Sequence, residues 1–378
     1  MYYFDHAATT NKKPDSVAQA VYAMLASAEY GNPNRGANRY SLNSNKKIEE
    51  TRKKLKRLFM ADDDYEVIFQ QNATMALNTI IKGLLTEKDH VITTVTEHNS
   101  VLRPLYQLGL AISFLPLARN YEVDLTMLEK LKQTNTKAVI VSHVSNVTGA
   151  ALNLEKISRF CRTNKLLLLV DVAQSAGVLP INCTKYALDA ICFTGHKSLF
   201  GPQGIGGICL KKTLVVEPLL SGGSGILSMA KCMPIDYPEH LEAGTLNTPG
   251  IMGLSAGIDY LCQQGEAVLE KKQRTWANLF YNGIKDLPQL TCYANPVLAK
   301  QNNIISFTLK GIDSATIATY LEEQENIIVR SGMHCAPLIH QALGTKATGV
   351  VRFSFSSMNT ELEVRHAIEA VKKLVKIM

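Results

Sequence analysis

The stretch Phe193-Thr194-Gly195-His196-Lys197 decides the fold of this 378-residue chain. It follows an apolar run, 187–193, that is typical of a buried strand, and it precedes the glycine-rich segment 201–207. A lysine beside a hydroxyl and an imidazole suits a cofactor with an aldehyde and a phosphate, because the amine can form a Schiff base while its neighbours hold the phosphate. In isolation, Gly-His-Lys would more simply indicate an exposed loop lysine.

Three polar side chains each follow a different strand-like run. They are His98 after 91–95, Asn146 after 138–142 and Asp171 after 166–170. A carboxylate at Asp171 is partly desolvated there and needs a cationic partner, which a protonated pyridine nitrogen supplies. Gln174 could bond the ring hydroxyl, His98 could stack on the ring, and Asn146 could bond its phenolic oxygen. Taken singly, a helix cap explains Asp171 equally well and explains His98 better.

Strand-like and helical patterns alternate between residues 60 and 210, which predicts an α/β fold with a mostly parallel sheet. The predicted strands are 66–69, 91–95, 112–115, 138–142, 166–170 and 190–193. Lys197 and the three side chains above all follow such strands, and ligands bind in the crevice beyond the carboxyl ends of parallel strands. The combination therefore indicates a site for pyridoxal phosphate.

The C-terminal part of the chain reads as a smaller α+β unit. Residues 221–248 are loop-like, and one long helical stretch, 251–287, follows them. The remaining predicted elements are strand 304–309, helix 314–324, strand 327–330, strand 350–355 and helix 360–377. We expect residues 12–263 to form a large cofactor-binding domain, and residues 1–11 with 264–378 to form a small one. Segment 201–207 enters a strand rather than a helix, which excludes a dinucleotide fingerprint.

Composition excludes several classes of function. Hydrophobic residues make up 46% of the chain, no apolar run is long enough to cross a bilayer, and the N-terminus lacks the pattern of a signal peptide, so we expect a cytoplasmic protein. The eight cysteines form no C-x-x-C, which disfavours a metal site. Much of the net charge of +7 lies on a predicted helix around 46–57. No aromatic residues interleave there, so a solvated face is favoured over nucleic-acid or membrane binding.

Short motifs spread along the whole chain have the order and spacing of one enzyme family. They are Asp5-His6-Ala7-Ala8-Thr9, Asn32-Pro33-Asn34-Arg35-Gly36, Asn72-Ala73-Thr74, Glu97-His98, Ser145-Asn146, Asp171-Val172-Ala173-Gln174, Thr194-Gly195-His196-Lys197, Glu242-Ala243-Gly244-Thr245, the run 330–337 and Val351-Arg352. On these motifs the chain resembles the class V aminotransferase branch of fold type I pyridoxal-phosphate enzymes. That resemblance implies an α/β fold whose large domain has a mostly parallel, seven-stranded type of sheet, with a smaller α+β C-terminal domain. Within that branch it is most similar to group II cysteine desulfurases and selenocysteine lyases.

The resemblance implies a role for each matching residue. The implied catalytic residues are Lys197, Cys335 and His98. The implied cofactor-binding residues are Ala73, Thr74, His98, Asn146, Asp171, Gln174, Thr194, His196, Lys197 and Thr245. The implied substrate-binding residues are Ala8, Asn146, Arg330 and Arg352. Thr245 would complete the phosphate site of a neighbouring subunit, which implies a homodimer with shared sites and pyridoxal phosphate in each.

The implied chemistry is the conversion of L-cysteine to L-alanine. Lys197 would remove the α-proton, the arginine fork of Arg352 would hold the carboxylate, and a thiolate at Cys335 would take the sulfur as a persulfide. Arg330 and His334 are close enough in sequence to give that thiolate a cationic environment. A sulfur-acceptor protein and a link to iron–sulfur cluster assembly would follow.

Three alternatives stay open at this point. The substrate could be L-selenocysteine, or the reaction could be a transamination or another elimination in which Cys335 takes no part. A non-enzymatic sulfur scaffold of the same fold is disfavoured, because a scaffold needs neither Lys197 nor Asp171.

Overall fold

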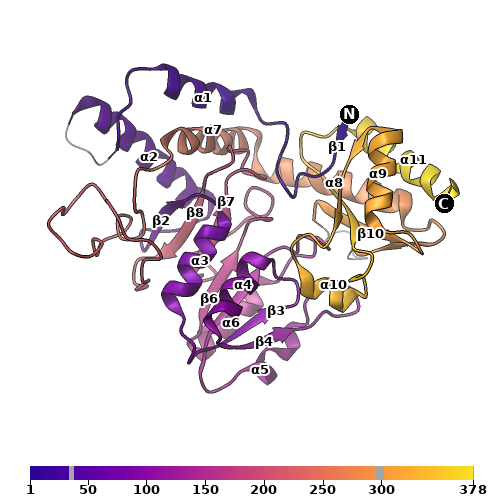
Figure 1. Ribbon diagram of the computed structural model, residues 1–378, viewed down its shortest axis with the longest axis horizontal. Helices are drawn as coiled ribbons and strands as arrows, with labels where there is room; N and C mark the ends of the chain where they lie inside the picture. Colours follow the sequence, from indigo (N-terminus) through magenta and orange to yellow (C-terminus); the bar gives the residue numbers. More distant parts are fainter. Residues whose placement is uncertain (34–37, 295–301, 378) are drawn as a thin grey trace.

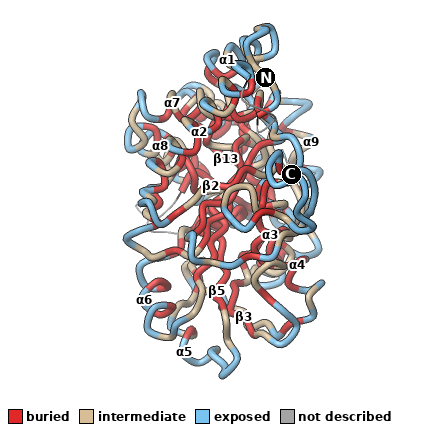
Figure 2. Tube along the Cα trace, turned by 90° about the vertical axis from the view of Figure 1, so that its left-hand side faces the viewer, coloured by how far each residue is buried: buried red, intermediate tan, exposed pale blue. Residues whose placement is uncertain are grey.

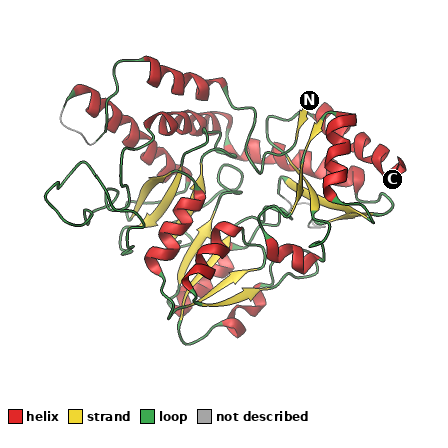
Figure 3. Cartoon of the chain, viewed as in Figure 1, coloured by secondary structure: helices red, strands yellow, loops and turns green. Residues whose placement is uncertain are grey.

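The computed structural model describes residues 1–33, 38–294 and 302–377, so Asn34, Arg35 and Gly36 of the second motif lie outside the described residues. Within that part, the strands form one sheet of seven strands, one of four and a pair of short strands (Figures 1 and 3). The seven-stranded sheet lies at the centre of a larger body, and the four-stranded sheet belongs to a smaller body that carries both termini.

The large sheet has the strand order β2-β8-β7-β6-β5-β3-β4. Its members are β2 (Tyr65–Gln70), β3 (His90–Thr94), β4 (Ala111–Leu115), β5 (Thr136–Ser142), β6 (Leu167–Asp171), β7 (Ala190–Thr194) and β8 (Gly206–Lys211). Only β8 runs antiparallel to its two neighbours, so the expected mostly parallel sheet is confirmed. The carboxyl ends of β3, β5, β6 and β7 consequently meet at one edge.

Successive side chains of each strand point to opposite faces of the sheet, and both faces are apolar. Val139 and Val141 of β5 pack into one cluster, and Ala138 and Ile140 pack into the other. The first face is covered by α2 (Arg39–Leu58), α6 (Leu154–Asn164) and α7 (Thr248–Gln264), and the second by α3 (Ala73–Leu84) and α4 (Asn99–Leu108). Figure 2 shows the result as a buried interior with exposure on the outer helices and loops.

The smaller body is built on an antiparallel sheet with the order β12-β13-β10-β9. Its strands are β9 (Leu290–Cys292), β10 (Ile304–Leu309), β12 (Arg330–Gly332) and β13 (Val350–Ser354), and its helices include α8 (Glu266–Ile284), α9 (Ser314–Glu325), α10 (Pro337–Leu343) and α11 (Glu361–Ile377). A separate apolar cluster fills it, with Phe280 stacked on Phe353 at a centroid distance of 4.4 Å. The division at residues 11/12 and 263/264 stays a prediction.

The start of the chain belongs to this smaller body. Strand β1 (Tyr2–Tyr3) pairs in parallel with β11 (Ile327–Ile328). The expected single strand at 327–330 is therefore two short strands, β11 and β12, in different sheets. The expected long helix at 251–287 is likewise two helices, because Gly265 has a φ of 82° and separates α7 from α8.

The basic helix α2 is not simply a solvated face. Arg52 is 3% exposed and forms a bidentate ion pair with Glu242, with nitrogen–oxygen distances of 2.9 and 2.7 Å. The expectation of a solvated basic face was wrong at this position, because Arg52 is buried together with a carboxylate from a distant loop.

The remaining elements are α1 (Asp15–Ala26), a 3-10 turn at Leu125–Met127 and α5 (Leu128–Leu131). None of the helices described is long and apolar enough to cross a membrane.

Candidate active site

A cavity of about 250 Å³ lies where the carboxyl edge of the large sheet faces β12 and β13. Nearly all the side chains singled out in the sequence line it. They are Ala8, Ala73, Thr74, His98, Asn146, Asp171, Gln174, Thr194, His196, Lys197, Arg330, Cys335 and Arg352. The parallel strands deliver the large-body residues to one edge, and the antiparallel pair of β12 and β13 delivers the two arginines from the opposite side.

Lys197 follows β7 and lines the centre of this set. Burial lowers the pKa of its ammonium from the usual 10.5 to about 8; the Asp171 carboxylate opposes that shift, and Arg352 and Arg330 add to it. A substantial fraction of the amine is therefore unprotonated just above neutral pH, which is the form that attacks an aldehyde or accepts a proton.

One corner of the cavity has the features of a phosphate site. The hydroxyl of Thr194 is buried and has no hydrogen-bond partner among the described residues. Ala73 and Thr74 form the first turn of α3, where free backbone N–H groups and the helix dipole favour an anion. The Thr74 hydroxyl lies 2.8 Å from that of Ser100, at the start of α4, so two helix N-termini meet in this corner.

Two local features shape that corner. A Cβ at Gly206 would lie 2.6 Å from the Phe193 carbonyl oxygen and 2.9 Å from the Asn72 Cα, so glycine lets β8 pass beside the turn that begins α3. The ring of His196 is held by its Nδ1, 3.0 Å from the Thr9 hydroxyl. Burial, followed by the charges of Lys197 and Lys13, lowers the pKa of His196 to about 4, so its neutral ring offers one N–H.

Asp171 ends β6 and its side chain is buried. Its Oδ1 accepts a hydrogen bond of 2.8 Å from the Ala173 amide, as a capping aspartate would. Burial nevertheless raises the pKa of the carboxyl, since one amide and the charge of Lys197 compensate it only in part. A cationic N–H donor in the cavity, such as a pyridinium, would complete its environment.

The sequence left two roles open for His98, a helix cap and a side chain at the cofactor ring, and its position suits both. It is the N-cap of α4, because its Nδ1 accepts a hydrogen bond of 3.0 Å from the Ser100 amide, and it also lines the cavity. Burial, with the charges of Lys197 and Arg330 next, lowers its pKa to about 4. The cap therefore fixes a neutral ring with its N–H on Nε2 at the cavity wall.

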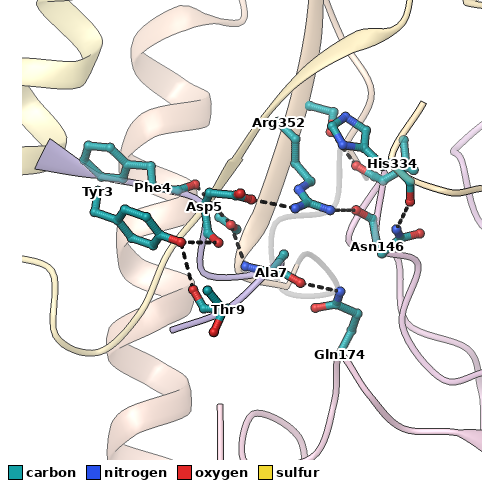
Figure 4. Close-up of polar contacts among 12 residues, drawn as sticks. Tyr3, Phe4, Asp5, Ala7, Thr9, Asn146, Gln174, His334 and Arg352 are labelled. Carbon is teal, nitrogen blue, oxygen red and sulfur yellow. Dashed lines mark hydrogen bonds and ion pairs between the residues drawn. The ribbon is translucent and has the colours of Figure 1, made fainter. Parts of the chain in front are cut away.

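Gln174 and Asn146 are held by contacts that cross the cavity (Figure 4). The Gln174 side-chain amide donates to the Ala7 carbonyl at 3.0 Å, which leaves its oxygen and its second N–H available to a ligand. The Asn146 amide donates to the His334 carbonyl at 2.7 Å, and the Asn146 carbonyl accepts from Arg352 at 3.0 Å. Asn146 thus connects the large sheet to both substrate-side segments.

Arg352 and Arg330 are paired in register on β13 and β12 and both line the cavity. Arg352 is 2% exposed; its Nη2 bonds the Asp5 carboxylate at 2.7 Å, and its Nε is buried with no partner among the described residues. Like charges directly opposite on antiparallel strands repel each other. The pair therefore forms a site that an anionic group would stabilise.

Cys335 is exposed and faces the same cavity from the loop before α10. His334 beside it is 4% exposed, and burial, together with the charge of Arg352, holds its pKa well below the usual value. The expectation that His334 supplies positive charge to the thiolate was wrong, because the buried ring is neutral. The basic side chains that line the cavity with Cys335 are Lys197, Arg330 and Arg352.

Thr245 is the one predicted site residue that lies elsewhere. It is exposed, it does not line the cavity, and its hydroxyl accepts a hydrogen bond of 3.3 Å from Asn32. The loop that carries it is anchored by the buried pair of Arg52 and Glu242.

Sequence reasoning missed three residues as site components. Ser100 bonds both Thr74 and His98, and Asp5 bonds Arg352. Glu97 is fully buried and accepts from Ser142 and Thr94, and burial raises its pKa to about 7. Asp5 and Glu97 lie inside motifs recognised in the sequence. A charged residue within such a motif was the available signal for these two.

Comparison with known proteins assigns the chain to a family. The family model described as aminotransferase class-V matches residues 2–366. The chain belongs to the class V aminotransferase family. A relative from Pyrococcus abyssi described as a probable cysteine desulfurase is 34% identical over 99% of this chain and 94% of its own. The cysteine desulfurase CsdA of Escherichia coli K12 is 28% identical over 100% and 94%.

Solved structures agree with this assignment to the class V family. The apo structure of a cysteine desulfurase from Thermococcus onnurineus NA1 has a TM-score of 0.91 and 31% sequence identity, and the match covers 100% of this chain and 95% of that one. The structure of Escherichia coli CsdA in its S-sulfonic acid form has a TM-score of 0.87 and 27% identity, with the same coverage. The predicted fold, a mostly parallel sheet of the pyridoxal-phosphate fold type I, is confirmed.

Proposed function

We propose that this chain is a pyridoxal-phosphate-dependent cysteine desulfurase, which converts L-cysteine to L-alanine and keeps the sulfur on Cys335 as a persulfide. The observation that carries the proposal is the exposed thiol of Cys335 in the same cavity as Lys197, Asp171 and two arginines. Full-length relatives described as cysteine desulfurases support it.

The residues in the cavity fit pyridoxal phosphate. Thr194, Thr74, Ala73 and His196 would hold the phosphate, where the buried hydroxyl of Thr194 lacks a partner. Asp171 would hold the proton of the pyridine nitrogen, His98 would lie against the ring, and the Lys197 amine would bind the cofactor covalently. Gln174 and Asn146 would bond the ring oxygen. Bound there, the cofactor supplies an electron sink that acidifies the α-carbon of an amino acid and weakens its Cβ–S bond.

Lys197 is the base in this assignment. Burial lowers the pKa of its Nζ to about 8. Once this amine is free of the cofactor, it would accept the α-proton, and it could later return a proton to form alanine. Burial raises the pKa of Asp171, and a cation beside the carboxylate would favour its ionised form. Lys197 would thus move a proton at the substrate, and Asp171 would hold one on the cofactor.

Arg352 and Arg330 bind the substrate in this assignment, next to Ala8 and Asn146. An α-carboxylate would accept from the guanidinium of Arg352, whose planar fork fits two oxygens, and would relieve the repulsion between the two paired cations. The Sγ of Cys335 then attacks the substrate sulfur. The new S–S bond forms as the substrate Cβ–S bond breaks, and the electron pair stays on the substrate carbon.

A second copy of the chain belongs to the proposal. The exposed Thr245, outside the cavity of its own chain, would complete the phosphate site of a partner subunit. The exposed position of Cys335 would let a thiol of a separate acceptor molecule collect the sulfur.

The decisive experiment is turnover of L-cysteine by the cofactor-loaded protein, with and without a thiol reductant. We expect alanine in both cases, stoichiometric without reductant and catalytic with it, because the reductant clears the persulfide. Pyruvate, or a keto acid formed with amino-group transfer, in place of alanine would contradict the proposal and indicate another reaction of the family.

A further inference from the structure

The start of the chain holds the arginine assigned to the substrate carboxylate. The Oδ1 of Asp5 accepts a hydrogen bond of 2.7 Å from Nη2 of Arg352, and Nη1 donates to the Asn146 carbonyl at 3.0 Å (Figure 4). The side chains of Asp5 and Arg352 are 16% and 2% exposed. The guanidinium is therefore held from two sides, by segments that are far apart in the sequence.

Asp5 is itself fixed by its neighbours. The Tyr3 hydroxyl donates to the carbonyls of Asp5 and Thr9 at 3.2 and 3.0 Å. Ser354, on the same strand as Arg352, donates its amide to the Phe4 carbonyl at 2.7 Å, and its hydroxyl accepts from Ala7 at 2.8 Å. Exposed ion pairs contribute little because two mobile side chains must be ordered. Here the backbone on both sides of the carboxylate is already ordered.

The charges around Asp5 add a second observation. Among the described residues, no other carboxylate pairs with Arg352 or with Arg330, which faces it on the neighbouring strand. One carboxylate against two guanidinium groups leaves one unit of positive charge. After the two observed bonds, Arg352 still has three N–H groups, one of them the buried, unpartnered Nε.

We propose that Asp5 is the positioning residue for Arg352: it fixes the guanidinium so that its free N–H groups meet the substrate α-carboxylate, and it leaves a net charge that suits a monoanion. This inference rests on the proposed function, in which Arg352 binds that carboxylate. Asp5 acts through Arg352 and does not itself contact the substrate.

The test compares Asp5→Asn with the matched control Asp313→Asn, on the cofactor-loaded protein. Asp313 caps α9, where it accepts from the Ala315 amide at 2.7 Å, and it does not line the cavity. We measure kcat and KM for L-cysteine, and by calorimetry the affinities for L-alanine and for ethylamine, which lacks a carboxylate. Asp5→Asn should raise the KM for cysteine and the Kd for alanine about tenfold, equal to about 1.4 kcal/mol. The affinity for ethylamine and the value of kcat should change little, and Asp313→Asn should change none of them.

A merely structural role would weaken alanine and ethylamine binding alike, and that result, or unchanged alanine binding, overturns the inference. If Asp5→Asn fails to fold, Asp5→Glu is used, which retains the charge and moves the carboxylate by one methylene. If the ratio of alanine affinity to ethylamine affinity is the same in Asp5→Glu as in the wild type, the inference is overturned. Arg352→Lys should lose the same discrimination, and adding Asp5→Asn to it should have little further effect. Failure of the wild type to form alanine from cysteine would instead contradict the proposed function, while the two binding affinities still test Asp5.

Discussion

The backbone amide of Asn99 donates a hydrogen bond of 2.7 Å to the carbonyl oxygen of Cys335. Asn99 is the first residue of α4 and directly follows His98, so this bond joins the cysteine loop to the edge of the large sheet. Cys335 and His334 have φ values of 56° and 47°, in the left-handed region that non-glycine residues rarely adopt. A loop held in that conformation places Cys335 at the cavity wall, where the proposed attack on a bound substrate needs it.

Cys335→Ala should retain cofactor binding and lose sulfur transfer from cysteine. No step before sulfur transfer needs the thiol, whereas the transfer has no acceptor without it. Wild-type protein treated with cysteine should gain one sulfur atom on the peptide that carries Cys335, and reductant should reverse the gain. Mass spectrometry of the digested protein measures this.

Cys232 provides the matched control, because it is also exposed but lies outside the cavity lining. Cys232→Ala should keep full activity and the persulfide on Cys335. Full desulfurase activity of Cys335→Ala would contradict the persulfide mechanism. Turnover of selenocysteine should decline less in that variant, because the weaker Cβ–Se bond can release selenium without thiolate attack.

Lys197→Ala should abolish turnover and the covalent link to the cofactor. Borohydride reduction of the loaded wild type, followed by peptide mapping, should place the label on Lys197. Lys13 is the informative control: burial lowers its pKa to about 8 as well, but it does not line the cavity. Label on Lys13, or on any other lysine, would show that the wrong amine has been assigned.

Asp171→Asn should fold and still bind the cofactor, yet lose most of its rate. The neutral amide cannot hold the proton of the pyridine nitrogen, so the electron sink weakens. We expect kcat to fall by roughly two or more powers of ten, each about 1.4 kcal/mol of activation free energy. Steady-state kinetics at saturating cysteine measure this. Turnover within a few-fold of the wild type would remove Asp171 from the role.

The free energy of unfolding of the cofactor-free chain should decrease as pH falls from 6.5 to 4. Burial, as the largest cause, lowers the pKa values of His6, His98, His143 and His196 from 6.5 to about 4. Between these pH values the unfolded chain binds more protons than the folded chain, so acid favours unfolding. Each histidine that behaves so contributes a slope of about 1.4 kcal/mol per pH unit within that window.

Urea unfolding at several pH values checks this slope. His98→Asn should flatten it, because asparagine can still cap α4 but does not titrate in this range. An unchanged slope in that variant would show that His98 titrates normally in the folded chain.

Much of the fold could be predicted from the sequence, because parallel strands that are buried on both faces appear in the sequence as continuous apolar runs. The polar residues that end those runs, such as Asp171 and Thr194, could be placed at one edge by topology alone. The short elements could not be predicted from the sequence. Two-residue strands such as Tyr2–Tyr3 have no periodicity, and helix α10 is too brief to show a repeat.

The missing parts of the site depend on contacts between distant segments. The sequence shows Arg52 among six other basic residues and cannot show that Glu242 reaches it. His334 is a histidine next to a cysteine in sequence, but its charge is decided by burial beneath β13, where its Nε2 lies 3.2 Å from the Val350 carbonyl. The role of His98 required both a cap and a cavity wall, and local sequence presented these as alternatives.

The pairing of the first residues with the last strands also constrains how the protein is made. The bond between Ala7 and Ser354 joins residues 347 positions apart, so on the ribosome the leading segment stays without its partner until nearly all of the chain has emerged. Contacts of such long range are slow to close. Arg352 acquires its counter-ion Asp5 only at that stage, so a nascent chain, or one truncated before residue 352, lacks part of the cavity wall. The cavity is thereby complete only after synthesis has passed residue 354.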